Sequence, residues 1–144
     1  MSRSEPPSRA DYKVFYPIST RWSDNDIYGH VNNVTYYSYF DTAANRYLIE
    51  EGGMDIGDGR IVGYVVSSGC EYHAPITYPE PIEAGLRVDR LGNSSVQYGL
   101  AIFSQGGQQA AAHGHFVHVF VDRAADRPVP IPVALRSALA RLLP

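Results

Sequence analysis

The chain has 144 residues, of which 44% are hydrophobic, and its formal net charge at neutral pH is −3. This length predicts one domain rather than two, and the hydrophobic content argues against disorder outside the chain ends. The small negative charge excludes the basic surface on which nucleic-acid binding depends, so we expect no nucleic-acid partner.

The N-terminal segment predicts a tail followed by a strand. Residues 1–10 are polar and carry two prolines, so we expect a flexible tail ahead of a single domain over residues 11–144. Apolar residues alternate moderately over residues 12–20, which indicates a first strand.

A long helix is expected next, over residues 34–51. Its apolar positions have helical spacing, and they are Tyr37, Phe40, Ala44, Tyr47 and Leu48. Asn32 or Asn33 is suited to cap the start of this helix, and the pair Gly52-Gly53 is suited to end it.

The remainder of the chain predicts consecutive strands and a short C-terminal helix. The expected strands cover residues 61–73, 82–91, 95–103 and 109–122, and the helix covers residues 133–143. Short breaks with glycine and asparagine favour antiparallel hairpins. One helix cannot cover both faces of such a sheet, but it can fill one concave face. The other face and the sheet edge remain available, which predicts a dimer.

The compartment is predicted from cysteine usage and hydropathy. Cys70 is the only cysteine, so no intrachain disulfide can form, as is typical of the reducing cytoplasm. No apolar run approaches the ~18 residues that a membrane span needs. The N-terminus has no apolar segment typical of a signal peptide. We therefore expect a cytoplasmic protein with no membrane partner.

The most informative motif is residues 21–33, which read RWSDNDIYGHVNN. Asp24 and Asp26 would point to the same side of an extended segment, where their repulsion would raise one pKa. Asn32, Asn33 and Val34 should begin the helix, and their backbone N–H groups lack intrahelical partners. Such donors can polarise a carbonyl group while a nearby carboxylate acts as base or nucleophile.

Three segments resemble the hotdog-fold acyl-CoA thioesterases, in particular the 4-hydroxybenzoyl-CoA thioesterase-like group. They are residues 21–33 continued by YYSYFD at 36–41, then EYHAPI at 71–76, and VDRLGNSS at 88–95. The resemblance, which spans about residues 12–122, implies an α+β hotdog fold: a five-stranded antiparallel sheet wrapped around one long central helix. It also implies a homodimer or homotetramer with active sites at the dimer interface.

The resemblance further implies metal-free hydrolysis of acyl-CoA or acyl-carrier thioesters, with coenzyme A as part of the substrate and no separate cofactor. Asp26 matches the acid that acts as nucleophile or general base, and Asn33 matches the residue whose backbone N–H polarises the carbonyl. His30 is a candidate supporting residue, either orienting the loop or touching substrate, with a structural hydrogen bond as the alternative. Asp24 is expected to cap or order the turn.

Several polar residues outside the motif are further candidates. Arginine and serine side chains suit the phosphates of coenzyme A, and this part of the chain carries Arg87, Arg90, Ser94 and Ser95. An exposed polar turn without a ligand would have the same composition. Asp41 either lines the acyl pocket or bonds a neighbouring subunit.

The histidines of the last strand do not predict a metal site. His113 and His115 share a face about 7 Å apart, whereas His118 points to the other face. A three-histidine zinc site on this strand alone therefore fails geometrically. Cys70 is expected to be a buried structural thiol.

Two other functions compete with hydrolysis. Hotdog enoyl-thioester hydratases pair an aspartate with a histidine around Asn-Pro, and residues 24–30 lack that proline. A non-catalytic module that binds acyl-CoA or an acyl carrier is the other alternative, against which Asp26 argues weakly.

Overall fold

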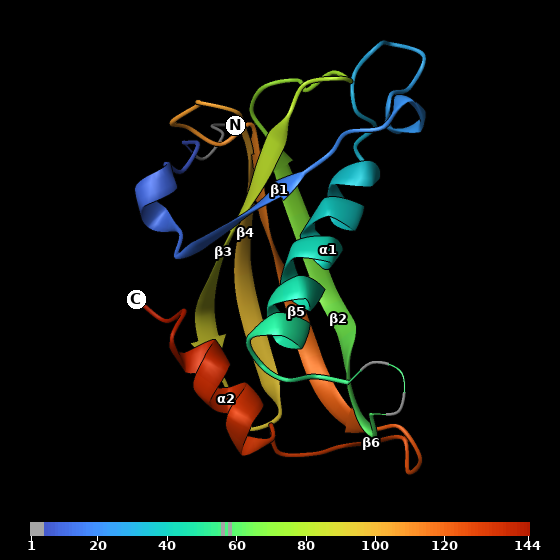
Figure 1. Ribbon diagram of the computed structural model, residues 1–144, viewed down its shortest axis with the longest axis vertical. Coiled ribbons are helices and arrows are strands. Elements are labelled where there is room, and N and C mark those ends of the chain that lie inside the picture. The colour runs from blue at the N-terminus through green and yellow to red at the C-terminus, as the bar shows by residue number, and fades with distance from the viewer. Residues whose placement is uncertain (1–4, 56, 58) are drawn as a thin grey trace.

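Figure 1 shows the computed structural model, which describes residues 5–55, 57 and 59–144. Its elements in chain order are η1 (Arg9–Asp11), β1 (Val14–Ile18), η2 (Trp22–Asp24), α1 (Thr35–Glu50), β2 (Ile61–Tyr72), β3 (Ile82–Leu91), β4 (Ser95–Ser104), β5 (Ala112–Asp122), β6 (Arg127–Pro128) and α2 (Val133–Ala140).

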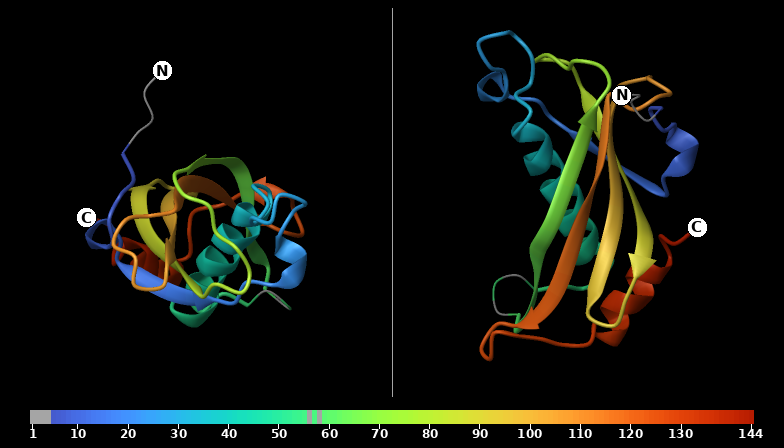
Figure 2. Two further views of the ribbon diagram at one scale, coloured as in Figure 1. Left: turned by 90° about the horizontal axis from the view of Figure 1, so that it is seen from above. Right: turned by 180° about the vertical axis from the view of Figure 1, so that it is seen from behind.

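The strands form one antiparallel sheet in the order β1-β3-β4-β5-β2, with β6 added beside β5. Viewed from above, the sheet curls around α1, which lies in its concave face (Figure 2). This arrangement confirms the predicted α+β hotdog fold. The strand β2 forms one edge of the sheet, and its central residues Tyr64, Val65 and Val66 are exposed.

The core lies between α1 and the concave face of the sheet. The helix buries residues that recur at intervals of three and four, which is why this segment is an amphipathic helix; they are Tyr36, Tyr39, Phe40, Ala43, Ala44, Tyr47 and Leu48. Ala43 and Ala44 are fully buried, so the helix backbone approaches the strands closely there.

Both ends of α1 follow the expected chemistry. The side chain of Asn32 accepts a hydrogen bond from Val34 N–H at 3.0 Å, and its carbonyl accepts one from Thr35 N–H at 2.9 Å. Gly52 N–H returns to the carbonyl of Leu48, and Gly53 takes a left-handed φ of 68°. No helix in the described ranges is long and apolar enough to cross a membrane.

Several elements have other bounds than the sequence predicted. The strand β1 covers Val14–Ile18 instead of residues 12–20, and α2 ends at Ala140 instead of residue 143. The last long strand begins at Ala112 rather than at residue 109, because Gln109 pairs with Ser8 and Ala110 N–H donates to the carbonyl of Pro7. Part of the predicted tail, residues 1–4, lies outside the described residues. Arg9 lies against the sheet, with its guanidinium 2.9 Å from Glu83. The domain boundary at residue 10 stays a prediction.

Candidate active site

A cleft of about 440 Å³ lies at the N-terminal end of α1. Its walls come from the acidic turn, the helix start and the segment after β2: Asp26, Tyr28, His30, Val31, Asn33, Tyr36, Tyr72, His73, Ala74 and Pro75. Val31 N–H donates to Ile76 O at 2.7 Å, and Tyr78 N–H donates to Asn25 Oδ1 at 3.2 Å. These two bonds hold the turn against the segment that leaves β2.

The turn that carries Asp26 is closed by its own backbone. Asp26 N–H donates to His30 O at 2.9 Å, and Gly29 N–H donates to Asp26 O at 3.0 Å. Gly29 has a φ of 80°, a left-handed conformation that glycine adopts without steric cost. Tyr28 N–H donates to Asp26 Oδ1 at 2.9 Å. Within the described part of the chain no group bonds Oδ2, so one carboxylate oxygen is available on the cleft wall.

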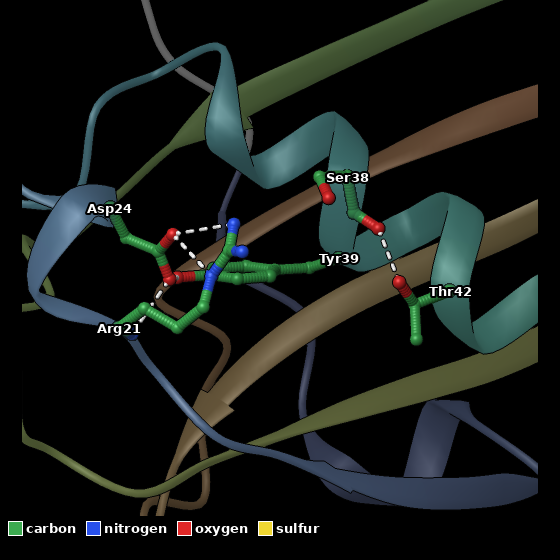
Figure 3. Close-up of polar contacts among 5 residues, drawn as sticks. All are labelled: Arg21, Asp24, Ser38, Tyr39 and Thr42. Carbon is green, nitrogen blue, oxygen red and sulfur yellow. Dashed lines mark hydrogen bonds and ion pairs between the residues drawn. The ribbon is translucent and has the colours of Figure 1, made fainter.

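Asp24 serves the fold of the turn, as the sequence predicted. Its side chain is 2% exposed and accepts hydrogen bonds from Arg21 N–H at 2.9 Å and from Tyr39 Oη at 2.8 Å (Figure 3). The Arg21 guanidinium lies 3.3 Å from the same carboxylate. Burial and the bond to Asp24 raise the pKa of Tyr39 well above its usual value. The acidic turn is thereby anchored to the second turn of α1.

The two acids of the motif have separate environments. Asp24 ends the short helical turn η2, and Asn25, which follows it, is extended. Asp24 faces Arg21 and Tyr39, whereas Asp26 lines the cleft. The alternative in which both carboxylates share one side is therefore wrong.

The start of α1 presents a backbone donor to the cleft. The N–H groups of Val34 and Thr35 are both bonded to Asn32. The Asn33 N–H meets no acceptor among residues 5–55, 57 and 59–144, and Asn33 lines the cleft. Tyr72 Oη donates to Asn33 O at 3.0 Å, which fixes the following peptide, between Asn33 and Val34.

His30 contributes to the turn through its backbone carbonyl, which accepts the Asp26 N–H. Its side chain is exposed and lines the cleft. A role for the His30 imidazole toward substrate stays a prediction.

An aromatic wall beside Asp26 was not predicted from sequence. Tyr36 and Tyr72 meet edge to face with ring centroids 5.1 Å apart, and Tyr28 also lines the cleft with its side chain exposed. Burial raises the pKa of Tyr36 to about 12, so this phenol is neutral. Both Tyr36 and Tyr72 fall within the motifs that carried the resemblance, but their contact depends on how α1 packs beside β2.

The residues predicted to bind coenzyme A lie elsewhere in the chain. Arg90, Ser94 and Ser95 belong to the β3–β4 hairpin, which contacts α2 through Arg136 and Gly92 at the far end of the sheet (Figure 1). A strand of ten residues such as β3 spans roughly 30 Å. One chain therefore does not bring this hairpin to Asp26, and the assignment stays a prediction that requires a second subunit.

Other polar candidates have structural partners. Arg87 is held by Asp89 at 2.8 Å and by the carbonyl of Asp11. Asp41 is exposed on α1 and bonded by the Asn45 amide, and it does not line the cleft.

The strand β5 places its histidines as the alternation predicted. His118 is buried and bonds Tyr98 Oη at 3.0 Å, whereas His113 bonds His73 and His115 bonds Ser67 on the opposite face. The described residues contain no group of three or more His, Cys, Asp or Glu side chains placed to hold a metal ion. Cys70 is half-buried, and burial raises the pKa of its thiol to about 11.

Several known proteins are similar to this chain in sequence and in structure. The sequence profile of the thioesterase-like superfamily matches residues 20–139. The PA5185 protein from Pseudomonas aeruginosa strain PAO1 is 64% identical, with a TM-score of 0.95 over 96% of each chain. A thioesterase from Thermus thermophilus, solved with coenzyme A and zinc, is 30% identical, with a TM-score of 0.75 over 89% of this chain and 98% of that one.

A match to a curated bacterial protein is shorter. The uncharacterised protein YsmA from Bacillus subtilis strain 168 is 26% identical over 88 residues. The match covers 61% of this chain and 59% of YsmA, less than two thirds of that protein's length.

Proposed function

The chain belongs to the thioesterase-like superfamily, and from that premise we propose that it hydrolyses acyl-CoA thioesters to a free acid and coenzyme A. One observation carries the proposal. A single cleft brings together the available carboxylate oxygen of Asp26 and the unpaired N–H of Asn33, as far as the described residues extend.

These two groups match the two electronic demands of the reaction. The thioester oxygen gains negative charge as its carbonyl carbon is attacked, and a fixed backbone N–H stabilises that charge. The positive end of α1 acts in the same direction, because helix N-termini favour anions. The Asp26 carboxylate either attacks the carbon or accepts a proton from water.

The walls of the cleft suit the acyl group. Tyr36 and Tyr72 present aromatic surface in the same cleft as Asp26, against which an apolar acyl group can pack. The Tyr72 hydroxyl also donates to the Asn33 carbonyl, and this bond ties the start of α1 to the end of β2 beside the cleft.

A second copy of the chain is part of the proposal. The edge strand β2 exposes Tyr64, Val65 and Val66, and an unpaired edge of this kind favours pairing with another strand. We infer a homodimer or homotetramer in which the partner supplies Arg90, Ser94 and Ser95 to the phosphates of the substrate. An acyl-carrier thioester would share the pantetheine arm and the reacting centre.

The test is a panel of acyl-CoAs with detection of the free thiol, run on wild type, Asp26→Asn and Glu50→Gln. Loss of a base or nucleophile should lower turnover by about 10²- to 10⁴-fold in Asp26→Asn. Glu50→Gln is the matched control, because Glu50 is an exposed carboxylate at the C-terminal end of α1, away from the cleft.

A folded Asp26→Asn protein with wild-type turnover would refute the proposal. Binding of acyl-CoA by the wild type without thiol release would favour the binding module. Addition of water to an enoyl-CoA without thiol release would favour the hydratase.

A further inference from the structure

Three side chains that the proposed mechanism does not use form a connected row at the end of β2. His73 Nε2 lies 2.8 Å from His113 Nδ1, and the two rings are nearly parallel, with an interplanar angle of 4°. His113 Nε2 lies 3.4 Å from Glu71 Oε2. The pairing of β2 with β5 sets this row, because Glu71 is directly opposite His113.

The row determines which ring nitrogens carry protons. Burial lowers the pKa of His113, and the neighbouring His73 and Arg87 act in the same direction while Glu71 opposes them, so His113 is neutral at neutral pH. A neutral imidazole has one N–H, and the Glu71 carboxylate can only accept, so that N–H is at Nε2. His113 Nδ1 is then an acceptor, and His73 must donate from Nε2. In this arrangement the remaining nitrogen of His73, Nδ1, is the one that can accept a proton.

His73 stands at the cleft. Together with Tyr72, Ala74 and Pro75 it forms the wall that faces the acidic turn. His73 and Ala74 also line a second cavity, which lies against the N-terminal segment and the β4–β5 turn. The histidine therefore borders both the cleft and a second hollow of about 700 Å³.

We propose that His73 is the base that activates water for the second half of the reaction, with His113 and Glu71 as positioning residues. This inference rests on the proposed thioester hydrolysis and assigns Asp26 the nucleophilic role. Once Asp26 is acylated its carboxylate cannot serve as a base, so hydrolysis of the acyl-enzyme needs a separate proton acceptor.

Each step conserves atoms and charge. An Asp26 oxygen bonds to the thioester carbon, and the C–S bond breaks with coenzyme A leaving as the thiolate. Water then gives a proton to His73 Nδ1, and its oxygen bonds to the acyl carbon of the Asp26 anhydride. The bond from that carbon to the Asp26 oxygen breaks, which releases the free acid and restores the carboxylate. The imidazolium returns its proton to the thiolate.

The decisive experiment is pre-steady-state kinetics of His73→Gln with an acyl-CoA that the wild type hydrolyses. If the substitution slows only hydrolysis of the acyl-enzyme, kcat and KM should fall together by about 10²- to 10⁴-fold, and kcat/KM should stay unchanged. The first turnover should then release a burst of one thiol per site. His115→Gln is the matched control, because His115 lies two residues from His113 on the same face and bonds Ser67 instead. It should behave as wild type.

A fall in kcat/KM without a burst, or unchanged kinetics of folded His73→Gln, would overturn the proposal. Asp26→Asn should lose thiol release with no burst, and this result tests the hydrolytic function separately.

The tautomer assignment has its own readout. Nitrogen-15 NMR of labelled histidines should show His73 protonated at Nε2 and bare at Nδ1, and Glu71→Gln should weaken that preference. Protonation of His73 at Nδ1 would overturn the proposed proton transfer from water to that atom. This measurement does not require the wild type to have thioesterase activity.

Discussion

The stability of the protein should depend on pH through His118, a histidine buried on the concave face of the sheet. Its side chain is 1% exposed, and its Nδ1 is hydrogen-bonded to the hydroxyl of Tyr98 at 3.0 Å. Burial lowers the pKa of His118 from 6.5 to about 4. The folded protein therefore keeps this ring neutral at a pH where the unfolded chain protonates it.

The sign and size of the effect follow from this difference. Between pH 6.5 and pH 4 the unfolded state binds more protons than the folded state, so the free energy of unfolding falls as the pH falls. A shift of 2.5 units (6.5 minus 4) corresponds to about 3.4 kcal/mol when fully expressed. At pH 5 the loss relative to pH 8 is about 2 kcal/mol.

The assay is urea unfolding at pH 8 and pH 5 for wild type, His118→Gln and His115→Gln. Protein concentration is held constant, because subunit association would add to the apparent stability. Gln does not titrate, so His118→Gln should lose about 2 kcal/mol less than wild type over this interval. His115 lies on the other face of β5 and bonds Ser67, so His115→Gln should leave the wild-type pH dependence in place. Equal losses in wild type and His118→Gln would refute the reasoning.

Two further substitutions test the packing around the site. Tyr39→Phe removes a hydroxyl donor from the buried Asp24 carboxylate, so the free energy of unfolding should fall by about 1–3 kcal/mol. Urea unfolding measures this change, with Tyr64→Phe, at an exposed tyrosine, as the control. Equal stability of the two variants would contradict the prediction. Gly114→Ala places a methyl group onto the backbone carbonyl of Gly69 in the neighbouring strand and should cost about 3 kcal/mol. A thermal melt indistinguishable from wild type would contradict that close approach.

Several elements of this fold were predictable because they depend on local spacing. The strand β3 has the expected bounds, since hydrophobic alternation ends at the Gly92-Asn93 turn. The helix α1 runs within one residue of the expected range, with Asn32 and Gly53 serving its two ends. The predicted start of β5 was wrong, because Ala110 bonds Pro7, far away in sequence, instead of continuing the strand.

Some features of the candidate site were likewise predictable from the sequence, and others were not. The separate roles of Asp24 and Asp26 could be anticipated in part, because a buried carboxylate needs donors that the helix start can supply. The row from Glu71 through His113 to His73 could not be anticipated, since it depends on a strand pairing across some 40 positions of sequence.

The curled sheet around one helix was implied by the resemblance to a known family. By itself the sequence determined the types of the long elements and the turn that holds Asp26. These follow from short-range periodicity and from backbone preferences of Gly29 and Asn32, which act within a few residues. The tertiary structure alone decided which groups meet in and around the cleft: Tyr72 with the Asn33 carbonyl, Tyr39 with Asp24, and His73 with His113. Register and burial set these contacts, because a shift of one residue in the β2–β5 pairing would turn Tyr72 or His113 to the opposite face of the sheet.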